Sequence, residues 1–277
     1  MNKDINDITY LENCETVPVV RFHPFDGIEW LNCGFSTRTG GVSGGCHSSL
    51  NLGFERGDRQ ENVIANFRLF SDSAGFDVEK ICLPSQWHTN NIRIADICDM
   101  GWEKPEEPVD GQITDKKGPV LIAYGADCSP VFLADKAHRA IGLVHSGWKG
   151  TLNSIVCDAL RMMSENYGTK PEDIIAVIGP SISMDSYEVG PDVAEHFIGK
   201  YRIDVRDDSP IIKNGIREGK YQLDLWEAIR TDLLAYRIKD INIHKSGLCT
   251  FKEKDLFYSH RRDGNARGVM AAFMSII

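Results

Sequence analysis

Three side chains of this sequence could together hold a metal ion. Cys128 and His145 lie in the segment 123–150, AYGADCSPVFLADKAHRAIGLVHSGWKG, and His88 lies upstream in QWHT. Zn²⁺ accepts a thiolate and imidazoles as ligands in a tetrahedral arrangement. Three protein ligands with the fourth position open are typical of a catalytic zinc. The residue types therefore predict a catalytic zinc held by His88, Cys128 and His145.

Buried strands are predicted to position two of these ligands. The continuous apolar runs 119–124 and 140–144 are typical of such strands, and Cys128 and His145 follow their C-terminal ends. Loop residues at strand ends can be held firmly by the scaffold. An alternative interpretation makes Cys128 a buried thiol that packs as a small apolar group, and His145 a hydrogen-bonded core histidine. Spacing alone does not decide, because no pair has the short separation of a zinc finger.

The remaining periodic segments predict the fold class. Apolar residues recur at helical spacing in 61–75, 151–163 and 223–236, and Gly75 is expected to stop the first helix. The segment 151–163 lies between two predicted strands and should complete a β-α-β unit. We predict an α+β fold, a single layered domain over residues 1–277 with a mixed β-sheet flanked by helices. Further strands are predicted at 17–22, 28–31 and 174–178.

Composition narrows the functional classes. The chain has 277 residues, 42% of them hydrophobic and 26% charged, as in an ordinary globular protein. A formal net charge of −9 argues against general binding to nucleic acid, which relies on clustered Lys and Arg. No apolar run is long enough for a membrane span, and the polar N-terminus does not resemble a signal peptide. We expect a cytoplasmic enzyme, with its eight cysteines reduced.

Two positions in the first half of the chain have both a functional and a structural interpretation. Arg38 lies in the glycine-rich stretch 35–45, whose backbone N–H groups could surround an anion, or it is a solvent-exposed arginine in a flexible turn. Asp110 precedes a glycine, which is typical of a turn residue. Alternatively, its carboxylate faces the substrate or supports the metal ligands from behind.

The second half of the chain offers four more such residues. Trp148 either packs in the core or lines a substrate pocket. Glu188 is a candidate proton donor or substrate-binding carboxylate, or a surface glutamate. Arg261 and Arg262 form either a phosphate clamp or a structural ion pair near Asp263.

Seven motifs, in order from about Gly34 to the C-terminus, resemble the YfiH family, also called laccase-domain or polyphenol-oxidase-like. The resemblance implies that the histidine of Q-x-H, the cysteine of A-D-C and the histidine of H-x-G-W bind a catalytic zinc, here His88, Cys128 and His145. It also implies an active-site role for Arg38 in the S-T-R motif. Thr89 departs from the glycine common after the first ligand. The motifs are FSTRTGG, SLNLG, QWHT, GADCSPV, HSGWKG, GPSISMDSYEVG and CTFKEKDLFYSHRRDG.

The same resemblance implies a function. Family members look like purine nucleoside enzymes that phosphorolyse adenosine, inosine and S-methyl-5'-thioadenosine to free base and pentose 1-phosphate, and deaminate adenosine. The expected partners are purine nucleosides and phosphate, with zinc as cofactor and copper possible; the oligomeric state is open. Arg38 with Arg261 or Arg262 is expected at the phosphate, Asp110 and Trp148 beside the substrate, and Glu188 orienting the nucleoside.

Two other classes of enzyme remain open at this point. One is a copper oxidase of phenols, the older interpretation of the family. One Cys and two His do not supply the several copper centres that four-electron reduction of dioxygen would use. The other is a cysteine hydrolase, with Cys128 as nucleophile and His145 as base.

Overall fold

Two large β-sheets pack face to face in the computed structural model, which describes residues 2–12, 17–206 and 208–277. The seven-stranded sheet has the order β1-β2-β3-β4-β16-β8-β5, and the six-stranded sheet the order β15-β11-β9-β10-β7-β6. Side chains from both sheets meet in one apolar core, where the rings of Phe22 and Phe132 lie 4.8 Å apart. The strands of the first sheet are Lys3–Asp4 (β1), Thr9–Glu12 (β2), Val19–Phe22 (β3), Leu31–Ser36 (β4), Ile81–Cys82 (β5), Val120–Gly125 (β8) and Met270–Ile276 (β16).

The second sheet carries the hairpin β9–β10, which lies next to the ligand loops. All seven residues of each hairpin strand are buried, so a continuous apolar run was the correct signal for a strand here. Strands β10 and β11 are parallel, with β9 between them, as expected for the predicted β-α-β unit. The strands are Ile92–Ile94 (β6), Gly111–Thr114 (β7), Ser129–Asp135 (β9), Ala140–Ser146 (β10), Ile174–Ile178 (β11) and Ile243–Lys245 (β15).

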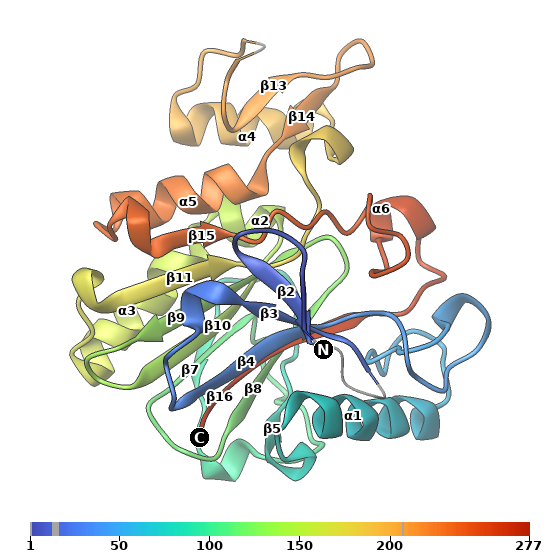
Figure 1. Ribbon diagram of the computed structural model, residues 1–277. Helices are drawn as coiled ribbons and strands as arrows, with labels where there is room; N and C mark the ends of the chain where they lie inside the picture. Colours follow the sequence, from blue (N-terminus) through green and yellow to red (C-terminus); the bar gives the residue numbers. More distant parts are fainter. Residues whose placement is uncertain (1, 13–16, 207) are drawn as a thin grey trace.

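Helices cover the outer faces of both large sheets (Figure 1). On the seven-stranded sheet lies α1, whose Val63, Phe67 and Phe70 are fully buried and whose C-terminus is closed by Gly75 at φ 73°. Helices α3 and α5 pack on the six-stranded sheet. The helices are Gln60–Ala74 (α1), Trp148–Leu152 (α2), Ile155–Tyr167 (α3), Pro191–Tyr201 (α4), Leu225–Ala235 (α5) and His260–Asp263 (α6).

A three-stranded sheet, ordered β12-β14-β13, packs with α4 in a separate small core near the start of α5. Its strands are Glu188–Val189 (β12), Ile212–Asn214 (β13) and Tyr221–Leu223 (β14). The mixed sheets with flanking helices confirm the predicted α+β class. The prediction of a single domain stays a prediction. Among the described residues, no helix combines the length and apolar character of a membrane span.

Two predicted elements were wrong in their bounds. The segment 28–30 is a turn that closes through a hydrogen bond from Leu31 N–H to the Ile28 carbonyl, so the strand begins only at Leu31.

The predicted helix 151–163 is two helices, because Ser154 adopts the left-handed conformation at φ 57°. The ammonium group of Lys200 holds this break by donating to the Thr151 carbonyl and to the Ser154 hydroxyl, each at 2.8 Å. Apolar periodicity continued across the break, so the sequence pattern could not reveal it.

Candidate metal centre

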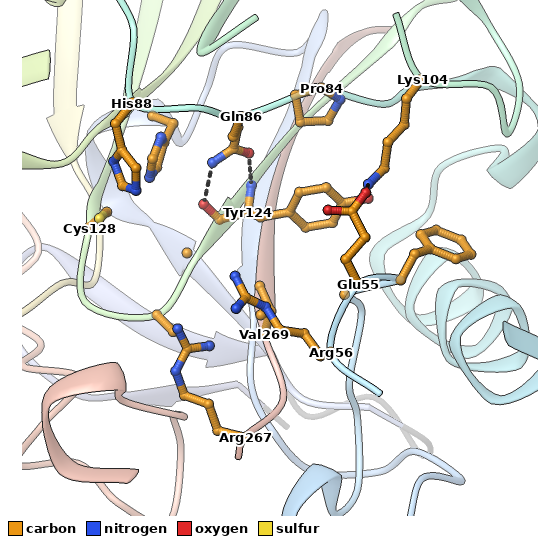
Figure 2. A pocket seen from close by; sticks show the side chains of 15 residues that line it. Glu55, Arg56, Pro84, Gln86, His88, Lys104, Tyr124, Cys128, Arg267 and Val269 are labelled. Atoms are coloured by element: carbon orange, nitrogen blue, oxygen red, sulfur yellow. Dashed lines mark hydrogen bonds and ion pairs between the residues drawn. The ribbon is translucent and has the colours of Figure 1, made fainter. Parts of the chain in front are cut away.

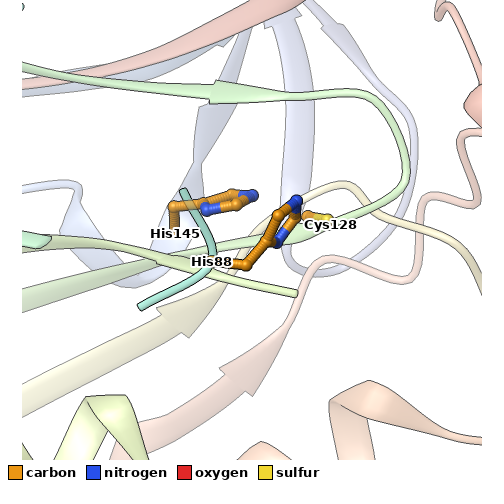
Figure 3. Close-up of side chains that lie close together, drawn as sticks. All are labelled: His88, Cys128 and His145. Carbon is orange, nitrogen blue, oxygen red and sulfur yellow. The ribbon is translucent and has the colours of Figure 1, made fainter. Parts of the chain in front are cut away.

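The three predicted ligands converge where the two large sheets meet. His88 follows β5, Cys128 lies in the loop that crosses from β8 to β9, and His145 is the sixth residue of β10, inside the strand rather than beyond its end. One ligand atom from each side chain lies within 4.8 Å of the other two (Figure 3). Tetrahedral zinc with bonds of about 2.0–2.3 Å separates its ligand atoms by roughly 3.3–3.8 Å. Small side-chain adjustments would therefore close the group around one ion.

Asp110 holds two of the ligands in place from behind. Its carboxylate accepts a hydrogen bond from Nδ1 of His145 at 2.9 Å, so Nε2 of that ring is left to face Cys128. The same carboxylate accepts the backbone N–H of Trp87, His88 and Thr89, at 3.1, 3.0 and 2.7 Å. Burial alone would raise the pKa of Asp110, but the hydrogen bonds from His145 and Thr89 outweigh it and hold the pKa at about 2.

The charges of the site favour a cation. Burial would lower the pKa of His145, but the charges of Cys128 and Asp110 overcome this and raise the pKa to about 9. Partial desolvation and the neighbouring His145 charge lower the pKa of His88. A bound metal ion would take the place of the proton that His145 holds in the metal-free group.

Gly147 leaves the space that the ligand atoms use. A Cβ atom at this position would lie 2.8 Å from Nδ1 of His88 and 2.9 Å from Sγ of Cys128. Real Cβ atoms do not approach other atoms so closely, so a larger residue would displace both ligands. The residues present fit a zinc ion. The donor atoms are two imidazole nitrogens and one sulfur, the carboxylate of Asp110 orients the ring of His145, and Gly147 leaves room for the ligand atoms.

Two cavities lie next to this group, and both are lined by His88 and Cys128. The smaller has a volume of about 140 Å³ (Figure 2), and the larger a volume of about 430 Å³. Five residues line both: Arg56, His88, Ala126, Cys128 and Arg267. The smaller cavity is otherwise mainly polar, with Glu55, Gln86, Lys104 and Tyr124, whereas the larger one is lined by Trp148, Ile182, Tyr187, Leu225, His260 and Arg261.

Some of the predicted substrate residues lie at these cavities. Trp148 and Arg261 line the larger one, and the Arg261 guanidinium stacks on the Tyr187 ring at 5.0 Å. Asp110 lies behind the three predicted ligands and hydrogen-bonds to two of them, and its functional role stays a prediction.

Three other predicted residues are not among those that line the two cavities. Arg38 stacks on Tyr258 at 4.4 Å and donates to the carbonyls of Ser48 and Lys254. Glu188 forms an ion pair with Arg217, which lowers its pKa. The functional roles given to these two residues stay predictions.

Arg262, the third, shows the contacts of its structural interpretation. Its guanidinium donates to both oxygens of Asp263 and to the carbonyls of Thr250, Phe251 and Phe257. These contacts account for its donors without a ligand.

Sequence reasoning missed the two arginines shared by both cavities. Arg56 lies in FERGD, directly after the SLNLG motif, and Arg267 lies in NARGV, just after SHRRDG. Both are flanked by glycine and stand next to recognised motifs, which is the signal that could have found them.

Comparison with known proteins places the chain in a family. The family model described as "Multi-copper polyphenol oxidoreductase laccase" matches residues 32–277. The chain belongs to this family. A relative from Bacteroides thetaiotaomicron, named "Purine nucleoside phosphorylase", is 37% identical over 242 residues, which are 84% of this chain and 87% of the relative. "Purine nucleoside phosphorylase YlmD" of Bacillus subtilis is 35% identical over 248 residues, 88% of this chain and 87% of the relative.

Solved structures of this laccase-like family share the fold. The crystal structure of YlmD from Geobacillus stearothermophilus superimposes with a TM-score of 0.84 at 31% identity and covers 96% of this chain and 98% of its own. The Bacillus licheniformis protein YfiH gives a TM-score of 0.85 at 29% identity, over 96% of this chain and 99% of its own. The predicted resemblance to the YfiH family is thereby confirmed.

Proposed function

We propose that this protein is a zinc-dependent purine nucleoside enzyme. It would cleave adenosine, inosine and S-methyl-5'-thioadenosine with phosphate, giving the free base and pentose 1-phosphate, and would deaminate adenosine. The observation that carries the proposal is the open group of His88, Cys128 and His145 at the place where two cavities of different character meet. The names of the curated relatives support the phosphorylase activity.

The two cavities suit the two parts of the reaction. The larger one has the volume and the aromatic side chains, Trp148 and Tyr187, to receive a purine base. The smaller one is polar and carries cationic groups, which suits an oxyanion. The sugar would then lie between them, next to the ligand group. A bound zinc ion would supply Lewis-acid polarisation of a substrate atom or of water.

Hydrogen bonding by the chain would fix the protonation of this site. Asp110 keeps the proton of His145 on Nδ1 and leaves Nε2 free for a metal ion. It also anchors the loop that carries His88. The chain's own part in turnover is thus to orient the ligands and to place the two substrates on either side of them.

Product analysis on zinc-loaded protein tests the proposal. We expect inosine plus phosphate to give hypoxanthine and ribose 1-phosphate, with no hypoxanthine when phosphate is omitted, and adenosine to give inosine in addition to adenine. His88→Ala should abolish both reactions, whereas the matched control His196→Ala, on the exposed face of α4, should retain them. Rapid oxidation of a phenol under air without hypoxanthine release would overturn the proposal in favour of a copper oxidase.

One observation favours a second candidate, a cysteine hydrolase. Cys128, His145 and Asp110 are arranged as nucleophile, base and orienting carboxylate, and Cys128 helps to raise the pKa of His145. Alkylation distinguishes the two functions. Zinc at saturation should protect Cys128 from iodoacetamide in a metalloenzyme, and equal labelling with and without zinc would support the hydrolase.

A further inference from the structure

Arg267 carries a buried positive charge that the described residues do not fully satisfy. Only 5% of the residue is exposed, and it immediately precedes the stretch that leads into β16. One terminal nitrogen donates to the Gly268 carbonyl at 3.0 Å, but Nε has no hydrogen-bond partner. A buried donor without a partner is costly, and a buried cation without an anion more so. Such a group is expected to have a partner that the protein chain does not supply.

Arg56 adds a second guanidinium to the same place. Both side chains line both cavities, and both guanidinium groups point into the smaller cavity (Figure 2). After burial, the charge of Arg56 is the largest cause that lowers the pKa of Arg267, to about 10. Two like charges held together in a cavity repel each other unless an anion lies between them.

The nearby carboxylates are already engaged. Glu55 forms its ion pair with Lys104 at 2.7 Å. Asp127 accepts from the Thr250 hydroxyl and from the Arg261 backbone N–H, each at 2.6 Å. Within residues 2–12, 17–206 and 208–277, neither Arg56 nor Arg267 forms an ion pair with a carboxylate. The two cations are therefore available to an anion from solution.

We propose that Arg56 and Arg267 form a binding site for a phosphate dianion, placed beside His88 and Cys128. Planar guanidinium groups bind phosphate oxygens through paired hydrogen bonds, which suits an arginine pair better than a lysine pair. The position next to the candidate metal ligands makes inorganic phosphate, the second substrate, the expected occupant; this part rests on the proposed function.

The site would then hold the nucleophile of the reaction. An oxygen of hydrogen phosphate forms a bond to C1' of the sugar while the bond from C1' to the purine nitrogen breaks. The purine leaves with the electron pair and takes the proton that the phosphate gives up. The charge of the pentose 1-phosphate equals that of the hydrogen phosphate, so the two arginines face the same net charge before and after the step.

Direct binding of inorganic phosphate to the zinc-loaded protein, without nucleoside, tests the site by calorimetry. We expect the dissociation constant to rise at least 10-fold in Arg267→Met and in Arg56→Met, with partial recovery in Arg267→Lys. Arg68→Met, on the exposed face of α1, is the matched control and should bind as the parent does. Because Arg267→Met removes a buried unpaired charge, its unfolding temperature should not fall, and this separates loss of binding from misfolding.

The outcomes distinguish this site from the proposed function. Unchanged phosphate affinity in both methionine variants would overturn the site, whether or not nucleosides are cleaved. Weaker phosphate binding in a protein that cleaves no nucleoside would support the site and refute the proposed function. A parallel titration with adenosine 5'-monophosphate identifies the source of the phosphate group: if the variants lose affinity for this nucleotide but not for inorganic phosphate, the assignment to inorganic phosphate is overturned.

Discussion

Replacing Gly147 by alanine should weaken zinc binding without weakening the fold. The backbone at this residue has φ −75° and ψ 179°, which alanine adopts without strain. The new methyl group, however, would lie 2.8 Å from Nδ1 of His88 and 2.9 Å from Sγ of Cys128. Ordinary contact distances are about 3.5–4.0 Å, so each ligand atom must move by roughly 0.6 Å or more.

A displacement of this size exceeds what the metal tolerates. Ligand distances in a zinc site lie within about 0.2 Å of their usual values. Loss of a group that merely orients a ligand weakens binding about 10-fold to 100-fold. Since Gly147→Ala moves two ligands at once, we expect a loss of zinc affinity of at least about 100-fold. The free energy of unfolding of the metal-free protein should stay the same or rise by about 0.4–1 kcal/mol, because alanine restricts the unfolded chain.

Competition with a chromophoric chelator measures the affinity, and the thiolate absorption band of Co²⁺-substituted protein reports whether Cys128 still binds. Gly199→Ala in α4 is the matched control, because a Cβ atom there meets nothing within 4 Å. If Gly147→Ala binds zinc within about threefold of the parent, these three side chains are not the ligand set, or they do not bind in this geometry.

Three further predictions follow from individual contacts. Asp110→Asn should lower zinc affinity about 10-fold to 100-fold, measured by the same competition assay, because it weakens the hydrogen bond that orients His145. The hydrogen bonds that Asp58 accepts hold its pKa at about 2, below the value of about 3.9 in an unfolded chain. Asp58 therefore contributes stability above about pH 4 that is lost as the pH falls towards 2, and Asp58→Asn should flatten the urea midpoint over this range. Arg262→Lys should lower the free energy of unfolding by about 1–3 kcal/mol in urea, since lysine cannot reach Asp263 and three carbonyls together; unchanged stability would contradict the structural role.

The parts of the fold that the sequence predicted well are those where one local signal dominates. The runs 119–124 and 140–144 form strands of the two facing sheets. Because both faces of these strands are buried, their apolar residues do not alternate with polar ones. The end of α1 at Gly75 was predicted because glycine alone adopts the left-handed conformation at no steric cost. Ser154 adopts the same conformation, but an ordinary serine gives no warning of it. The break between α2 and α3 depends on Lys200, which lies far away in the sequence.

The residues of the site also differ in how clearly the sequence marks them. The two histidines and the cysteine could be predicted because their side chains have chemistry that few other residues offer and because their motifs were recognisable. Arginine is different: this chain has many surface positions for it, and only the cavity shows which ones face a ligand. Arg56 and Arg267 are distinguished from other arginines by the burial of Arg267 and by their proximity to each other in the cavity. Both features exist only in the folded chain. Arg38 carried a motif signal, yet its guanidinium is occupied by Tyr258 and two carbonyls.

The loop that carries His88 shows how one carboxylate supports an unfavourable backbone. His88 has φ 59°, a left-handed conformation that costs a residue with a side chain on the order of 1–3 kcal/mol. Asp110 offsets this cost by accepting the N–H groups of Trp87, His88 and Thr89, and the Thr89 hydroxyl adds a further bond at 2.8 Å. The hydroxyl of Thr89 thus gives Asp110 one more donor from the same loop. The same carboxylate also orients His145. Asp110 alone therefore stabilises both the strained backbone of His88 and the tautomer of His145.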